Sequence, residues 1–184
     1  MPYAFKLIIF GDGGVGKTTL VHRYITGGFS EGTQMTIGVD FAVKSIQVGG
    51  ESVDLQIWDF GGEDRFRFIL PAYATGAKGG IFMYDITRPP TFLHVDDWME
   101  VLAERTKDIP IIFVGTKADL ETERGVPRET VAAAAKKYRV SVMFEVSSKT
   151  GYNVESAFET ISKIMIKNTV LAPLKRKIAI FSDV

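Results

Sequence analysis

The sequence of 184 residues contains no cysteine. This absence excludes disulfides, thiolate metal ligands, cysteine nucleophiles and cysteine-linked lipid anchors from the chain as it stands. Its 22 basic and 22 acidic residues cancel in charge, which removes any general attraction to nucleic acid or to an anionic membrane. It also has no apolar run long enough to span a bilayer and no signal-peptide pattern at the N-terminus. We therefore expect a cytoplasmic protein that does not bind nucleic acid.

The remaining composition is that of a globular protein, with 46% apolar and 24% charged residues. The length predicts a single domain over residues 1–167, followed by a C-terminal tail over residues 168–184. The tail carries Lys175, Arg176 and Lys177 next to apolar residues. Three charges at about 1 kcal/mol each support at most weak membrane contact, so a solvated tail is the favoured interpretation.

Short apolar runs alternate with amphipathic stretches along the chain. The runs are continuous at residues 7–10, 81–84 and 111–114 and weaker at 142–146, as expected for strands buried on both faces of a parallel sheet. Residues 40–48 and 53–58 instead alternate in polarity around Gly49-Gly50, which predicts an antiparallel hairpin. Helices are expected at residues 17–26, 91–106 and 128–138, and from an N-cap at Asn153. The pattern predicts a doubly wound α/β fold.

Residues 11–18, which we call the phosphate loop, fit the pattern G-x-x-x-x-G-K-[ST]. Glycines let several backbone N–H groups turn toward one anion, and the N-terminus of the following helix adds partial positive charge. Lys17 supplies a cation for the β- and γ-phosphates, and Thr18 supplies a hydroxyl for Mg²⁺. A glycine-rich turn without a ligand is the alternative, but the required strand precedes this loop and a helix follows it. The loop indicates a nucleoside triphosphate without distinguishing ATP from GTP.

Other loops supply groups that complete such a site. Asp59 ends an apolar strand, where it can reach Mg²⁺, and Gly62 can present its N–H to the γ-phosphate; a strand-end turn is the alternative for Asp59. A buried Asp119 can accept both N–H groups on one edge of guanine, a pair that adenine lacks. Lys117 can lie along the base, and the N–H groups of residues 147–149 can meet guanine O6. Phe29 is interpreted equally well as a core residue or as a base contact.

Taken together, these motifs resemble those of the Ras superfamily of small GTPases, and most closely those of its Rab branch. Residues 36–41 (TIGVDF) resemble the Rab first switch, and Trp58-Asp59, Gly62 and Arg65-Phe66 resemble the second. Residues 84–87 (YDIT) and 147–151 (SSKTG) are also Rab-like. The resemblance covers about residues 3 to 167.

The resemblance implies a P-loop GTPase fold, with a six-stranded, mostly parallel sheet, one antiparallel strand and helices on both faces. It also implies a GDP/GTP switch of the kind used in vesicle trafficking, in which Thr36 and Gly62 sense the γ-phosphate. Thr18, Thr36 and Asp59 would hold Mg²⁺. Catalysis would involve Lys17, Thr36, Gly62 and Glu63. The nucleotide would contact residues spread over six stretches of the sequence, namely Gly13, Gly14, Val15, Gly16, Lys17, Thr18, Thr19, Phe29, Thr36, Gly62, Thr116, Lys117, Asp119, Ser147, Ser148 and Lys149.

The sequence departs from the family pattern at several positions. Glu63 stands where the family has its catalytic glutamine; an ionised carboxylate accepts but cannot donate a hydrogen bond, and it brings negative charge toward the γ-phosphate. It is also the better base, so the sequence leaves open whether Glu63 speeds or slows hydrolysis. Thr116 stands where asparagine is commonest, and its hydroxyl can still tie the phosphate loop to the base loop. Residues 28–36 contain no arginine, so we expect an activating protein in trans, with Arg65 or Arg67 as possible contributors.

The leading hypothesis is a monomeric GTP-hydrolysing switch that is read by effectors, an exchange factor and an activating protein. The second is a GTP-binding scaffold with negligible turnover, because Glu63 replaces glutamine. The third, a P-loop ATPase or kinase, is disfavoured by Asp119. His22 and His94 have no second ligand at metal spacing and are interpreted as structural or surface residues. The missing cysteines are the largest departure from Rab proteins, which usually end in prenylated cysteines; a truncated chain and a prokaryotic relative that never used prenylation are the two explanations.

Overall fold

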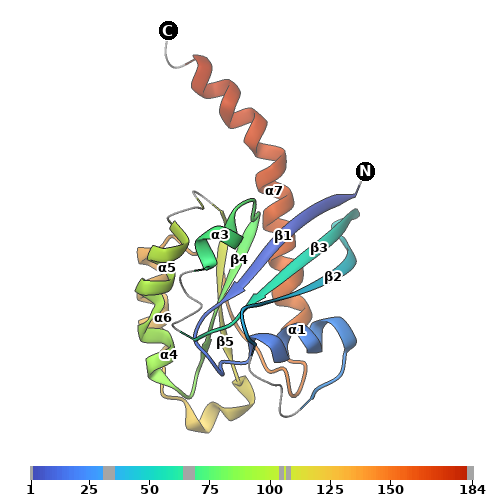
Figure 1. Cartoon of the computed structure of the whole chain (residues 1–184). Helices are drawn as coiled ribbons and strands as arrows, with labels where there is room; N and C mark the ends of the chain where they lie inside the picture. Colours follow the sequence, from blue (N-terminus) through green and yellow to red (C-terminus); the bar gives the residue numbers. More distant parts are fainter. Residues whose placement is uncertain (1, 31–35, 64–68, 104–105, 107–108, 182–184) are drawn as a thin grey trace.

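The structure, a computed structural model, describes residues 2–30, 36–63, 69–103, 106 and 109–181, with residues 172–181 described by their backbone alone. A six-stranded sheet of order β2-β3-β1-β4-β5-β6 forms its centre (Figure 1). All neighbouring strands pair in parallel except β2 and β3. The strands span Tyr3–Phe10, Val39–Val48, Glu51–Phe60, Gly79–Asp85, Ile111–Thr116 and Met143–Glu145 for β1 to β6 in turn.

The central strands are apolar on both faces because helices cover both. In β1, Leu7 and Ile9 join the core beneath α1 and α7, whereas Ile8 and Phe10 join the core beneath α3 to α6. Strands β4 and β5 divide their side chains between the two cores in the same way. The apolar runs of the central strands are therefore continuous because both faces of these strands are buried, as the sequence predicted.

The helices lie where the sequence places them, with some differences. Helices α1, α6 and α7 span Lys17–Thr26, Arg128–Lys137 and Val154–Phe181. The expected helix over residues 91–106 is instead two helices, α4 at Pro89–Leu93 and α5 at Val95–Ala103, which meet at His94. The sequence missed α3 at Leu70–Ala74 and the 3₁₀ helix η1 at Ala118–Glu123, because both are too short to show a helical period.

Two local features expected from the sequence, the hairpin turn at Gly49-Gly50 and the helix N-cap at Asn153, are both described by the structure. The hairpin between β2 and β3 is confirmed: Gly49 and Gly50 both have positive φ, 60° and 83°, as its tight turn requires. Asn153 directly precedes α7, as expected of its N-cap, and its carbonyl accepts from the N–H of Ala157 at 3.1 Å, but its side chain bonds elsewhere. Its φ of 57° is left-handed, and its side-chain amide donates 3.0 Å to the carbonyl of Glu145. That contact joins the start of α7 to the end of β6.

Helix α7 continues across residue 168 as one element of 28 residues. In Figure 1 its C-terminal part projects away from the sheet. Residues 168–181 are therefore helical, and the division of the chain at residue 167 stays a prediction. Among the described residues, no helix is both long enough and apolar enough to cross a bilayer.

The buried face of α7 is expected to contribute strongly to stability. Ile161 is fully buried against Gly79 of β4, so Ile161→Ala should lower the free energy of unfolding by about 3 kcal/mol. Val170, on the same helix, is 54% exposed, and Val170→Ala should change the free energy of unfolding by less than about 0.5 kcal/mol. Urea unfolding in one buffer measures both variants. Equal effects would contradict the packing of α7 on the sheet.

Candidate functional site

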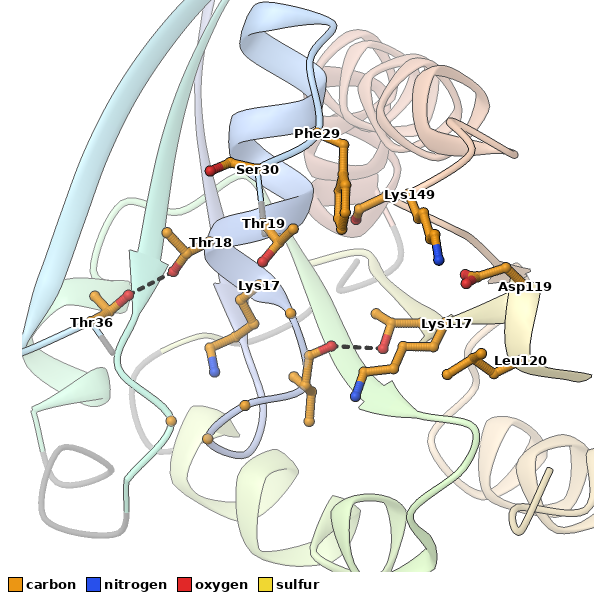
Figure 2. Close-up of a pocket in the computed structure, with 17 residues that line it drawn as sticks. Lys17, Thr18, Thr19, Phe29, Ser30, Thr36, Lys117, Asp119, Leu120 and Lys149 are labelled. Carbon is orange, nitrogen blue, oxygen red and sulfur yellow. Dashed lines mark hydrogen bonds between the residues drawn. The ribbon is translucent and has the colours of Figure 1, made fainter. Parts of the chain in front are cut away.

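A cavity of about 660 Å³ opens at the carboxyl ends of the parallel strands. Figure 2 shows Lys17, Thr18 and Thr36 toward one end and Lys117, Asp119 and Lys149 toward the other. The lining brings together six separate stretches of the sequence, namely Gly13, Gly14, Val15, Gly16, Lys17, Thr18, Thr19, Phe29, Ser30, Thr36, Gly62, Thr116, Lys117, Asp119, Leu120, Ser148 and Lys149. Fifteen of these positions coincide with the residues proposed from sequence; Ser30 and Leu120 are additional.

The phosphate loop joins the end of β1 to the start of α1 and depends on a glycine at its first position. Gly11 has φ of 135°, and a Cβ there would lie 2.1 Å from the carbonyl oxygen of Met83. No other residue type fits this turn without moving β4. The loop therefore begins where β1 and β4 lie against each other, and this close approach limits the conformation of its first residue.

Lys17 carries the charge of the loop and is only 6% exposed. Its ammonium donates to the carbonyls of Gly11 and Asp12, at 2.8 Å each. Burial lowers the pKa of Lys17 to about 8, although the nearby carboxylates of Asp59 and Asp12 oppose this shift. A buried cation held by carbonyl groups gains strongly from an anion placed beside it. This end of the cavity is therefore suited to a phosphate group.

Thr18, Thr36 and Asp59 form a small oxygen cluster beside Lys17. The Thr18 and Thr36 hydroxyls lie 2.6 Å apart, and both are within hydrogen-bonding reach of Asp59 Oδ2. Burial raises the pKa of Asp59 to about 6. Its other oxygen, Oδ1, is buried with no hydrogen-bond partner among the described residues. Hard oxygen ligands with a spare buried acceptor fit Mg²⁺, which prefers carboxylate and hydroxyl oxygens together with phosphates.

The other end of the cavity is built by the loops after β5 and β6. Thr116 Oγ1 lies 2.6 Å from the carbonyl oxygen of Val15, so its hydroxyl links this end to the phosphate loop, as expected from sequence. Lys117 has a left-handed φ of 62°, and its ammonium lies 2.7 Å from Asp85 Oδ2. Ser147 Oγ donates 2.5 Å to Asp119 Oδ1 and thereby orients that carboxylate. Ser147 acts on the site through this bond, while Ser148 and Lys149 line the cavity.

Two side chains differ from their expected burial. Phe29 is 38% exposed and lines the cavity, so its interpretation as a core residue is wrong. Asp119 is exposed and not buried, because its side chain lies in the wall of an open cavity. A ligand that occupies this end would itself remove the carboxylate from water. The discrimination expected of Asp119 therefore depends on the ligand completing the burial.

The segment after β3 lies directly against the phosphate loop. A Cβ on Gly62 would lie 2.3 Å from the backbone of Asp12 and Gly13, so only glycine permits this approach. The N–H of Gly61 donates 2.8 Å to the carbonyl of Gly38, which joins this segment to the one that carries Thr36. Glu63, the last described residue of the segment after β3, is half-buried. Arg65, Phe66 and Arg67 lie outside the described residues.

The sequence did not reveal a set of contacts on the outer side of the phosphate loop. Asp12 accepts from Trp98 Nε1 at 2.8 Å, and its other oxygen lies 2.6 Å from His94 Nδ1. Arg88 donates 3.1 Å to the carbonyl of Gly13. These partners are 75 to 86 residues away in the chain, so no local pattern signals them. His94 is a structural residue, as expected, but one that contacts the loop itself.

Comparison with known proteins agrees with the geometry of this site. The model of the Ras family matches residues 6–167. The chain is 36% identical to the Ras-related protein Rab-13 of Rattus norvegicus over 168 residues, which cover 91% of this chain and 82% of that protein. It is 41% identical to the Ras-related protein RABA2a of Arabidopsis thaliana over 160 residues, covering 86% and 73%. The chain therefore belongs to the Ras family and is a Rab-like small GTPase.

Proposed function

We propose that this chain binds GDP and GTP with Mg²⁺, hydrolyses GTP slowly on its own, and acts as a molecular switch. The observation that carries the proposal is one continuous cavity with a buried lysine at one end and a serine-oriented aspartate at the other. The first group suits a polyphosphate and the second suits the N–H edge of guanine. The family match supports the same general reaction.

At the phosphate end, Lys17 and the loop N–H groups bind the β- and γ-phosphates. Thr18, Thr36 and Asp59 hold Mg²⁺, which when bound neutralises charge on the phosphate oxygens. In hydrolysis a water oxygen forms a bond to the γ-phosphorus, the bond from that phosphorus to the β–γ bridging oxygen breaks, and the water's protons pass to the products. Gly62, through its N–H, and Glu63 join Lys17 and Thr36 as the chain's groups next to the attacked phosphate.

In the proposed switch, protein partners recognise the arrangement of the two segments that carry Thr36 and Gly62. The hydrogen bond from Gly61 to Gly38 couples them, so a γ-phosphate that orders one also orders the other. Ile37 and Phe41 beside them are 79% and 50% exposed, and exposed apolar side chains next to the two coupled segments suit contact with a protein partner. Effectors, an exchange factor and an activating protein are the proposed partners of a monomeric chain, and any membrane contact is weak.

A second function, a GTP-binding scaffold with negligible hydrolysis, follows from Glu63 alone. Its carboxylate lies one residue beyond Gly62, which approaches the phosphate loop so closely that a side chain is excluded. Negative charge brought toward a γ-phosphate opposes an already anionic reaction centre. We expect this repulsion to slow hydrolysis without preventing nucleotide binding.

Guanine recognition by Asp119 is tested by Asp119→Ala. The variant should lose at least about a hundredfold in GDP affinity, because two N–H groups of the base would lose their acceptor, while ADP affinity stays low. The matched control is Glu123→Ala, which removes an exposed carboxylate in the same 3₁₀ helix as Asp119. This variant should bind GDP normally. Fluorescent-nucleotide titration measures both. Unchanged GDP affinity in Asp119→Ala would show that another group reads the base.

The role of Glu63 is tested by Glu63→Gln. Removing the carboxylate charge should raise the single-turnover rate of GTP hydrolysis about tenfold, which corresponds to about 1.4 kcal/mol in the barrier. GTP affinity should change little. Glu129→Gln, an exposed carboxylate on α6, serves as the control. A slower variant would mean that Glu63 acts as a base, and an equal rate would mean that it does not approach the reaction.

A further inference from the structure

Arg88 contacts the phosphate loop from the side of helix α4. It lies immediately before α4, and its Nη2 donates 3.1 Å to the carbonyl oxygen of Gly13. Its Nε donates 3.0 Å to Asp85 Oδ2. The guanidinium also lies within van der Waals reach of Gly14, whose added Cβ would be 3.5 Å from Nη2. The guanidinium group is planar and rigid, so its two hydrogen bonds, to Gly13 and Asp85, fix the position of this side chain.

The contact with Gly13 acts on a peptide group that the nucleotide site shares. In a planar trans peptide the C=O and the following N–H point to opposite sides. The Gly13 carbonyl points to Arg88, so the N–H of Gly14 points away from Arg88, and Gly14 lines the cavity. A cation on the carbonyl side withdraws electron density from the peptide and makes its N–H a stronger donor.

We propose that Arg88 is a positioning residue of the phosphate site, which orients and polarises the Gly13–Gly14 peptide toward the phosphates of the bound nucleotide. The inference rests on the proposed function, because it requires a nucleotide in this cavity. It adds a cation that acts from outside the phosphate loop and belongs to none of the sequence motifs. Arg88 does not touch the nucleotide in this arrangement, and it acts through the loop backbone.

Asp85 holds Arg88 in place. Its carboxylate is fully buried and accepts from Arg88, from Lys117 and from the N–H and hydroxyl of Thr87. Burial alone would raise the pKa of Asp85, but the hydrogen bonds from Lys117 and Thr87 outweigh it and keep the pKa below its ordinary value. The carboxylate thus stays ionised. Because Arg88 and Lys117 share Oδ2, one buried oxygen anchors groups at both the phosphate end and the base end of the cavity.

A purely local role is the alternative, because the Arg88 side chain is 45% exposed and exposed ion pairs stabilise proteins little. The two roles differ in their effect on the electronic environment of the bound phosphates. A local ion pair affects unfolding but leaves the electronic environment of bound GDP unchanged. A positioning role changes the environment of the phosphates even when the fold is intact.

The test uses Arg88→Gln, Arg88→Lys and the control Arg128→Gln in the full chain with GDP and Mg²⁺. Arg128 is an arginine of similar exposure, 59%, that pairs with Glu121 and Glu145 away from the phosphate loop. Arg88→Gln should release GDP about three to ten times faster, as expected for one lost charge-assisted hydrogen bond. The ³¹P resonance of the β-phosphate should also shift. Arg88→Lys should fall between wild type and Arg88→Gln, and Arg128→Gln should match wild type.

Equal GDP release and an unshifted β-phosphate resonance in Arg88→Gln would overturn the proposal. Faster release with an unshifted resonance would also overturn it, because that combination indicates general loosening. If Arg88→Gln does not fold, Arg88→Lys decides the question through the same two measurements. Failure of the wild-type chain to bind GDP would instead overturn the proposed function and this inference with it, so the two failures are distinguishable.

Discussion

A lysine ammonium held almost out of water is the constraint around which the site is organised. Lys17 is 6% exposed, and the carbonyls of Gly11 and Asp12 hold its position at the end of the central strand. Carbonyl oxygens solvate a cation but do not neutralise it, and burial lowers the pKa of Lys17 to about 8. An anion in the cavity would remove this penalty. The buried ammonium therefore makes this end of the cavity suited to a phosphate group.

The phosphate loop is held in shape from several directions. Gly11 permits contact with β4, and Gly62 permits contact with the segment after β3. On the outer side, Asp12 is held by His94 and Trp98, and Arg88 holds the carbonyl of Gly13. On the base side, the Thr116 hydroxyl reaches the carbonyl of Val15. These contacts come from several strands, loops and helices at the same edge of the sheet, as expected for ligand sites in open α/β folds.

The sequence predicts those features whose signal is local. The apolar runs of β1, β4 and β5, the Gly49-Gly50 turn and the phosphate loop are readable because neighbouring residues determine them. The break at His94 and the side chain of Asn153 were not predicted. Both residues contact distant parts of the chain, the loop at Asp12 and the carbonyl of Glu145. Arg88 was missed for the same reason, since nothing near it in sequence indicates Gly13. Periodicity and motif spacing do not contain such long-range side-chain contacts.

The central claim is that this cavity holds a guanine nucleotide. The most direct measurement is to purify the chain with Mg²⁺ present throughout, denature it, and identify the released nucleotide by ion-exchange chromatography. The account predicts GDP or GTP in a stoichiometric amount, because the nucleotide supplies an anion to the buried Lys17 and N–H donors to the oriented Asp119. Release of ADP or ATP, or of no nucleotide, would contradict it.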